Sequence, residues 1–256
     1  MSVCELTFRS KALDYDTPVT VILPNNGPFE DIPTLYLLHG MHGNHSSWLR
    51  RTSIERYAEA HHCAVVCPDG AVWFYTDMAF GANHFSYVAD ELVEYTRRVF
   101  RLSHDREKTF IAGLSMGGYG AVKIALRRPE TFAAAASLSG CLDMTARLKR
   151  KEENPQIQAI WGLNYYDTIE GSDSDLFALL RNFPEDKPHP RIYAACGTSD
   201  SLYGDNIAFC KVIREEIARR GFSEDDFCYE EGPGAHTWDF WDKWIRPAMD
   251  YMMGAQ

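Results

Sequence analysis

The chain has 256 residues, of which 26 are Lys or Arg and 36 are Asp or Glu, so its formal net charge is −10. Hydrophobic residues make up 45% of the chain and charged residues 24%, which are the proportions of a globular protein rather than of a disordered or fibrous one. The acidic balance argues against a nucleic-acid partner, and no stretch approaches the roughly 20 apolar residues of a membrane span.

The residue patterns predict strands and helices that alternate along the chain. In chain order, the predicted elements are strands at 19–23 and 35–38, a helix from Ser46 or Ser47 to about Ala60, a strand at 63–67, a helix over 86–100, a strand at 109–114, a helix over 116–127, strands at 132–138 and 191–195, a helix over 205–220, a strand at 227–230, and a helix over 238–252 that Pro247 must kink or restart. This alternation predicts a single α/β domain over residues 1–256, with a mostly parallel sheet covered by helices on both faces.

Residues 141–190 interrupt the alternation, because about fifty residues there contain no clear strand. An insertion of that length in an α/β domain is typical of a lid or a substrate loop, although a surface excursion without a function stays open. The insertion carries a basic cluster made of Arg147, Lys149, Arg150 and Lys151. We interpret this cluster as a solvated face rather than an anion site.

The seven cysteines are an odd number, are scattered along the chain, and lie mostly in apolar runs such as Cys63–Cys67. The first residues lack the apolar region of a secretory signal. Both features predict reduced thiols in a cytoplasmic protein.

The motif Gly113-Leu-Ser115-Met-Gly117 lies between a predicted buried strand and a predicted helix. A turn this sharp favours residues without a Cβ on both sides of the central serine. The serine hydroxyl is then exposed at a helix N-terminus, where N–H groups favour a developing oxyanion. We therefore predict that Ser115 is a catalytic nucleophile; the alternative is a buried serine in a glycine-rich turn.

Serine needs a base to act as a nucleophile, and the base needs a carboxylate that orients it. Of the two histidines that follow Ser115, His189 directly precedes a strand and is expected at the wrong end of the sheet, whereas His236 follows the last strand and is the predicted base. Asp200 comes soon after the strand at 191–195 and is the predicted acid. Asp205 is the alternative, but its position suits the N-cap of the next helix.

An oxyanion hole requires two N–H donors. The residue after the nucleophile, Met116, is one candidate, and Met41 in a glycine-rich loop near the N-terminal part of the chain is the other. The same loop holds His39, His42 and His45, which also suggest a metal site. No cysteine or carboxylate lies beside them in the sequence, and the oxyanion role already accounts for the loop, so we predict no metal there. The serine mechanism requires no organic cofactor either.

Three segments together resemble the tributyrin esterase family: residues 37–48, residues 106–120, and Cys196–Asp200 combined with Gly234–Trp238. This family belongs to the esterase D-like α/β-hydrolases, which include S-formylglutathione hydrolases and feruloyl and acetyl-xylan esterases. The resemblance extends along the full chain and implies the α/β-hydrolase fold, the residues Ser115, Asp200 and His236 as catalytic triad, and Met41 and Met116 as oxyanion donors.

The resemblance also implies a substrate class. Related enzymes act on short acyl esters, acetylated sugars or hydroxycinnamate (feruloyl) esters, so the expected ligand is a small-molecule or oligosaccharide ester. Trp73 and Tyr75 are similar to a Trp-Tyr-Thr-Asp segment near the active site of the family, and they and Trp161 of the insertion are predicted substrate contacts. For all three, plain packing is the alternative.

We therefore predict a serine carboxylic ester hydrolase that works through an acyl-enzyme. One alternative keeps the triad and changes the substrate to a thioester of the S-formylglutathione type. The other is a non-catalytic binding protein on a hydrolase fold, since a fold does not determine a function. A fluorophosphonate probe separates the catalyst from the binder.

Overall fold

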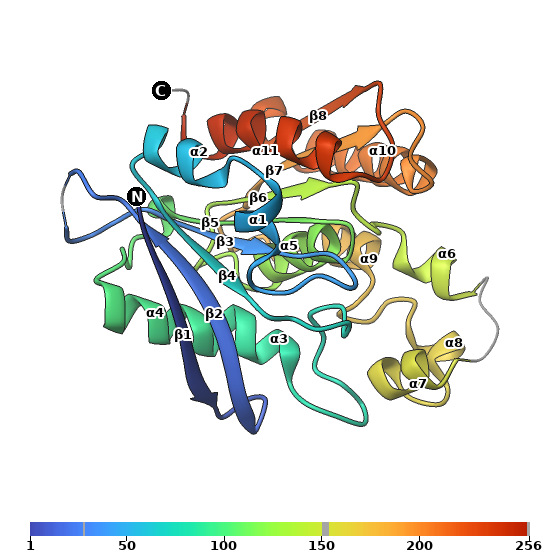
Figure 1. The fold of residues 1–256 in the computed structure, drawn as a ribbon. Helices are drawn as coiled ribbons and strands as arrows, with labels where there is room; N and C mark the ends of the chain where they lie inside the picture. The colour runs from blue at the N-terminus through green and yellow to red at the C-terminus, as the bar shows by residue number, and fades with distance from the viewer. Residues whose placement is uncertain (28, 150–153, 255–256) are drawn as a thin grey trace.

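The computed structural model describes residues 1–256 except Pro28, residues 150–153 and residues 255–256. Residues 150–153 belong to the predicted insertion and include two members of its basic cluster, Arg150 and Lys151, which therefore lie outside the described residues. The remaining chain forms one eight-stranded sheet with helices on both of its faces (Figure 1).

The strand order is β1-β2-β4-β3-β5-β6-β7-β8. The strands are β1 (Ser2–Ser10), β2 (Tyr15–Leu23), β3 (Thr34–Leu38), β4 (Ala64–Pro68), β5 (Thr109–Leu114), β6 (Ala134–Leu138), β7 (Arg191–Gly197) and β8 (Phe227–Gly232). From β4 to β8 all neighbouring strands run parallel, and β1 and β2 form an antiparallel hairpin whose second strand pairs antiparallel with β4. The predicted mostly parallel sheet is confirmed.

The described helices are α1 (Ser47–Arg51), α2 (Ile54–Ala60), α3 (His84–Ser86), a π-helical turn η1 (Tyr87–Glu91), α4 (Leu92–Phe100), a 3-10 turn η2 (Arg106–Lys108), α5 (Met116–Arg127), α6 (Met144–Lys149), α7 (Pro155–Trp161), α8 (Tyr165–Thr168), α9 (Leu176–Arg181), α10 (Tyr203–Arg220), a second 3-10 turn η3 (Glu224–Asp226) and α11 (Trp238–Met253). Two predicted helices are divided in the structure. The helix expected over 46–60 forms α1 and α2, and the helix expected over 86–100 comprises the end of α3, the π-helical turn η1 and α4. The helix α11 continues through Pro247, so Pro247 does not restart it, and a kink there stays a prediction.

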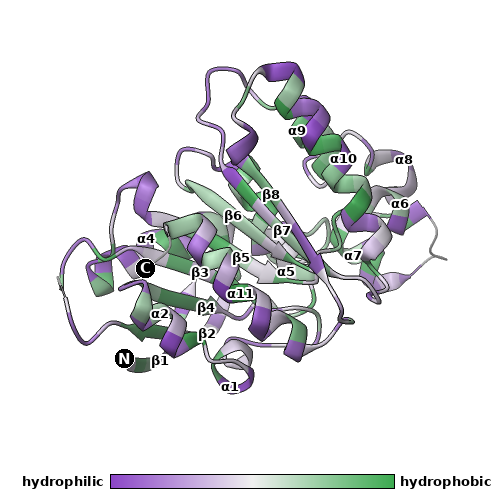
Figure 2. Ribbon diagram, turned by 90° about the horizontal axis from the view of Figure 1, so that it is seen from above, coloured by the Kyte–Doolittle hydropathy of each residue, from purple (hydrophilic) through white to green (hydrophobic). Residues whose placement is uncertain are grey.

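The core has two layers because alternate side chains of a strand point to opposite faces of the sheet. Leu35 and Leu37 of β3 join a buried cluster with residues of α1, α2 and α11. Tyr36 and Leu38 of the same strand join a second cluster with residues of α4, α5 and α10. Figure 2 shows β4 coloured as hydrophobic near the middle of the sheet, whereas α9 and α10 carry both colours because they also face solvent.

The insertion forms the short helices α6 to α9 and, in its described part, no strand. In Figure 1 the helices α6, α7 and α8 lie beside the end of the sheet at which β6 terminates. The carboxyl ends of parallel strands are where ligands bind in α/β sheets. The fold therefore places the insertion next to the edge at which Ser115, Asp200 and His236 also lie.

Candidate active site

Ser115 occupies a sharp turn between β5 and α5. Its backbone has φ 53° and ψ −116°, a conformation that costs energy in a non-glycine residue and is typical of functional sites. A Cβ on Gly113 would lie 2.4 Å from the carbonyl group of Gly117, and a Cβ on Gly117 would lie 2.5 Å from the carbonyl oxygen of Leu38. At such distances the backbone itself would have to move, which costs free energy, so both positions require glycine, as the motif predicts.

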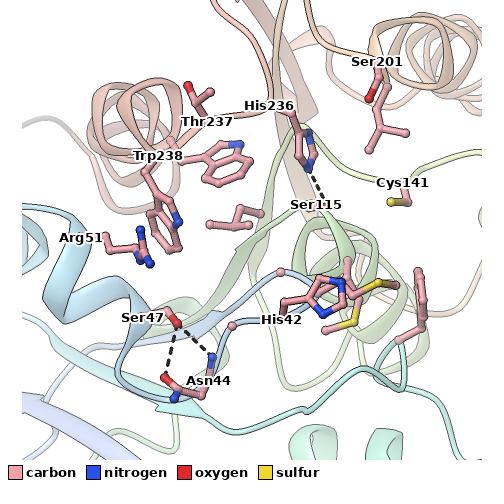
Figure 3. Close-up of a pocket in the computed structure, with 18 of the residues that line it drawn as sticks. His42, Asn44, Ser47, Arg51, Ser115, Cys141, Ser201, His236, Thr237 and Trp238 are labelled. Carbon is pink, nitrogen blue, oxygen red and sulfur yellow. Dashed lines mark hydrogen bonds between the residues drawn. The ribbon is translucent and has the colours of Figure 1, made fainter.

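Three side chains form a hydrogen-bonded chain at this turn (Figure 3). Ser115 Oγ lies 2.9 Å from His236 Nε2, and His236 Nδ1 lies 2.9 Å and 3.1 Å from the two carboxylate oxygens of Asp200. Since a carboxylate only accepts, His236 Nδ1 carries a proton, and in a neutral ring Nε2 then accepts from the Ser115 hydroxyl. The structure thus brings together the three residues expected from the sequence.

The loops after β7 and β8 hold Asp200 and His236 together. Ser199 N–H donates to the Gly234 carbonyl at 2.9 Å, and a Cβ on Gly197 would lie 2.4 Å from the same oxygen. Burial by itself raises the pKa of the Asp200 carboxyl, but hydrogen bonds from His236 and from Leu202 N–H outweigh this and hold the pKa below its usual value. Asp200 is therefore ionised at neutral pH and suited to orient an imidazole.

The other candidates occupy different surroundings. Asp205 lies in the first turn of α10, whose N-cap is Leu202, so the N-cap prediction for Asp205 is wrong. Asp200 is the residue hydrogen-bonded to His236. His189 packs against the rings of Phe183 and Phe222, and burial lowers its pKa to about 4. A ring held neutral between two aromatic side chains fits the packing role rather than that of the base.

The loop that contains Met41 is held by His39. Gly70 N–H donates to His39 Nε2 at 2.9 Å, so this nitrogen is the acceptor of the ring and Nδ1 carries the proton. His39 Nδ1 then donates to the Gly40 carbonyl oxygen at 2.7 Å, and Gly43 N–H donates to the same oxygen at 3.0 Å.

The Gly40 carbonyl determines the direction of the Met41 N–H group. The peptide between Gly40 and Met41 is planar and trans, so Met41 N–H points opposite to the bound carbonyl. Within the described part of the chain no hydrogen bond engages Met41 N–H. Met116 is the first residue of α5, and its N–H has no acceptor within the helix. Both groups suit an oxyanion.

An open cleft of about 700 Å³ lies at Ser115, a size common among ligand sites. Its lining combines the residues named so far with others from α1, the insertion and the start of α11. The lining residues are Gly40, Met41, His42, Gly43, Asn44, Ser47, Arg50, Arg51, Phe74, Leu114, Ser115, Met116, Cys141, Arg147, Ser201, Leu202, His236, Thr237, Trp238 and Trp241. Figure 3 shows Arg51 and Trp238 on one side of Ser115, and Cys141 and Ser201 on the other.

The predicted substrate contacts Trp73, Tyr75 and Trp161 are not part of this lining. Tyr75 is fully buried and donates its hydroxyl to the His39 carbonyl at 2.9 Å, so it supports the loop instead of facing a ligand. Trp161 packs on Phe74, with 5.5 Å between ring centroids, and Phe74 reaches the cleft in its place. The family pattern identified the segment, but the backbone decides which of its side chains points outward.

The sequence patterns did not predict several residues that line the cleft. Ser201 and Leu202 directly follow Asp200, and Trp238 follows His236 by two positions, so proximity to the predicted triad was the available signal. Arg50 and Arg51 had no such signal, because they reach the cleft only through the placement of α1 beside the Met41 loop.

The histidines of the Met41 loop have separate partners. His39 is bonded to backbone groups, and His45 Nδ1 lies 2.9 Å from Thr20 Oγ1. Among the described residues, no group of three or more His, Cys, Asp or Glu side chains is arranged to hold a metal ion. Of the helices described, none combines the length and the apolarity needed to span a bilayer.

Comparison with known proteins identifies relatives along almost the whole chain. The family model described as "Putative esterase" matches residues 10–251. An acetyl esterase of Caldicellulosiruptor saccharolyticus is 35% identical over 272 residues, which cover 98% of this chain and 98% of that protein. The chain is thus similar to an enzyme of the kind that the sequence motifs suggest.

Two solved structures from Staphylococcus aureus are similar in both sequence and fold. One is FphF, a fluorophosphonate-binding serine hydrolase with substrate bound, at a TM-score of 0.86 and 33% identity; the other is the S-formylglutathione hydrolase FrmB, at a TM-score of 0.85 and 32% identity. Each match covers 98% of both chains. The predicted α/β-hydrolase fold is confirmed, and this chain belongs to the esterase family of serine hydrolases and is a carboxylic ester hydrolase.

Proposed function

We propose that Ser115, His236 and Asp200 perform the hydrolysis as a catalytic triad. Ser115 Oγ attacks the ester carbonyl carbon while His236 Nε2 takes the hydroxyl proton. Asp200 keeps the proton on Nδ1 and stabilises the imidazolium that forms. When the tetrahedral intermediate collapses, its bond to the alcohol oxygen breaks, and His236 gives the proton to the leaving alcohol. The 2.9 Å contact between Ser115 Oγ and His236 Nε2 is the observation that carries this proposal.

The second half of the reaction repeats these steps with water. His236 takes a proton from water, whose oxygen attacks the acyl-enzyme, and the bond between the acyl group and Ser115 then breaks as the proton returns to Oγ. The N–H groups of Met41 and Met116 bind the carbonyl oxygen while it carries negative charge. Loss of one such donor typically lowers kcat about 10²- to 10³-fold.

We propose short acyl esters as the substrates, with acetyl esters of sugars first and feruloyl esters second. The acetyl esterase relative at 35% identity supports an acetyl group. Met41, Phe74 and Leu114 give the cleft an apolar lining next to Ser115, which suits a short acyl chain. An aromatic acyl group is the less supported choice, because the predicted stacking residues Trp73 and Tyr75 are outside the lining.

A thioesterase of the S-formylglutathione type is the second candidate. It is favoured by the 32% identity to FrmB, an S-formylglutathione hydrolase. The same triad can cleave a thioester, since the tetrahedral intermediate differs only in its leaving sulfur. The competing substrates therefore have to be compared directly.

The test is a panel of esters hydrolysed by the purified protein and by Ser115→Ala. The panel contains p-nitrophenyl acetate, longer p-nitrophenyl esters, an acetylated xylo-oligosaccharide, methyl ferulate and S-formylglutathione. We expect Ser115→Ala to lose at least about 10³-fold in kcat and to resist fluorophosphonate labelling. Ser86→Ala, which changes a serine outside the cleft, is the matched control. Equal turnover by wild type and Ser115→Ala would refute the triad, and a clear lead of S-formylglutathione would favour the thioesterase.

A further inference from the structure

Among the described residues, the lining of the active-site cleft carries basic but no acidic side chains. Arg50, Arg51 and Arg147 are part of this described lining, whereas none of its members is Asp or Glu. The chain as a whole has ten more acidic than basic residues. The charge of this cleft is therefore opposite in sign to the net charge of the chain.

Arg51 lies at the end of α1, with its guanidinium carbon 5.7 Å from the centroid of the Trp238 ring. Trp238 in turn packs edge-on against Trp48, at 5.4 Å between centroids. Arg50 uses Nε to bond Ser46 Oγ at 2.9 Å. In the described chain neither arginine forms an ion pair, so their remaining N–H groups are available to a ligand.

Arg147 belongs to α6, a helix that starts three residues after Cys141. Figure 3 places Cys141 across Ser115 from Arg51, and Arg147 is part of the lining of the same cleft. Arg147 is half-buried, and it also lacks an ion-pair partner among the residues described. By contrast, Lys149 of the same helix is paired with Glu170.

We propose that these arginines form an anion subsite, so that the preferred substrate is an ester that also carries a carboxylate or phosphate group. The inference rests on the proposed function of Ser115 and extends it to the substrate class. A guanidinium binds carboxylate and phosphate oxygens through two parallel N–H groups, and stacking on Trp238 restricts Arg51 before the ligand arrives. For Arg147, this replaces the interpretation of a solvated face.

Arg51 is expected to contribute on the leaving-group side. His236 Nε2 must give its proton to the leaving oxygen, so the alcohol part of the ester departs past His236. Trp241 packs edge-on against His236 at 4.9 Å, and Trp238 packs against Trp241 at 5.2 Å. These contacts connect Arg51 to the base through two indole rings.

The test uses two pairs of esters that differ in one charge. In the first pair the anion is on the leaving group: p-acetoxybenzoate against its methyl ester. In the second pair it is on the acyl group: the mono-p-nitrophenyl ester of adipate against the methyl p-nitrophenyl diester. The ratio of kcat/KM within each pair is measured for wild type, Arg51→Gln, Arg147→Gln and Arg56→Gln. The last variant is the matched control, because Arg56 of α2 lies outside the lining.

We expect Arg51→Gln to lower kcat/KM for p-acetoxybenzoate about fivefold to tenfold, with the neutral methyl ester and the Arg56→Gln control changed less than twofold. Arg147→Gln is expected to act in the same direction on at least one anionic ester. High salt should lower kcat/KM of wild type for the anionic esters more than for the neutral ones, because the arginines are partly exposed and their charge is screened. An effect confined to the adipate pair would place the anion on the acyl side and still support the subsite.

Equal losses on the charged and the neutral ester of both pairs would overturn the subsite, since the arginines would then act on the reaction and not on the substrate's charge. Unchanged ratios in both arginine variants would overturn it as well. Failure of wild type to hydrolyse any of the four esters would instead count against the proposed esterase function. Retained hydrolysis of the neutral esters shows that each variant is folded.

Discussion

The turn at Ser115 and the insertion at 141–190 both contact α5, but they are held in different ways. At the turn, backbone packs directly on backbone, with glycines at 113 and 117 that admit no side chain. The insertion consists of short helices whose buried side chains, such as Leu148 and Ile157, join the core, and the Tyr119 hydroxyl of α5 donates to the Ser174 carbonyl at 2.8 Å. The backbone thus constrains the turn at Ser115, whereas side chains hold the insertion in place.

The strongest test of this contrast is Gly117→Ala. Its Cβ would meet the Leu38 and His39 carbonyl oxygens at 2.5 and 2.7 Å, so the turn must shift. We expect kcat/KM to fall about 100-fold, since a displacement of about 1 Å suffices for that, and stability to fall by about 1–3 kcal/mol. The control is Gly204→Ala, where a Cβ meets no atom within 4 Å. Unchanged kinetics of Gly117→Ala on an ester of the panel would contradict the backbone constraint.

The next largest expected effect concerns Lys123, a buried residue of α5, and the pH dependence of the free energy of unfolding. Lys123 Nζ donates to Thr76 Oγ1 at 2.6 Å, and burial lowers its pKa to about 7 from a usual 10.5. Between these values the unfolded chain binds a proton that the folded protein lacks, so this residue makes wild type more stable as pH rises. Below about pH 7 the full penalty of burying the charge is present.

We therefore expect the stability of wild type relative to Lys123→Met to increase by about 2 kcal/mol from pH 7 to pH 9, as measured by urea unfolding. Subtracting the variant cancels the contributions of other titrating groups. A difference that is constant over this range would show that Lys123 stays charged in the fold.

His39→Ala tests the support of the Met41 loop. Without the bond to the Gly40 carbonyl, the Met41 N–H loses its fixed direction, and we expect kcat to fall about tenfold with KM changed less than about twofold. His104→Ala, at an exposed histidine outside the cleft, serves as control. If KM rose while kcat stayed constant, His39 would support ground-state binding instead of the oxyanion.

Tyr119→Phe addresses the insertion and should have the smallest effect. The Ser174 carbonyl loses its donor, so we expect a loss of about 1 kcal/mol in unfolding free energy. The turn at Ser115 keeps its own contacts, so kcat/KM should change less than about threefold. A larger kinetic than thermodynamic effect would show that the insertion controls the reacting groups and would remove the distinction between the two regions.

Local patterns predicted the central strands well because these strands are short, apolar and bounded by turn residues. The hairpin strand β1 was missed, although Cys4, Leu6 and Phe8 alternate with polar residues and face the protein. Phe8 stacks on Tyr95 of α4 at 4.1 Å, a contact between residues far apart in the sequence. Alternation over a single segment is a weak signal until such a partner is known.

Local patterns in the sequence were sufficient to predict the turn at Ser115, the chain order of Ser115, Asp200 and His236, and the mostly parallel sheet. Each of these depends on local rules: glycine at crowded positions, and ligands beyond the carboxyl ends of parallel strands. The packing of separate elements places Phe74 rather than Tyr75 in the cleft and brings arginines of α1 and α6 into its lining. These outcomes depend on how separate elements pack, and no spacing along the chain encodes the distance between them.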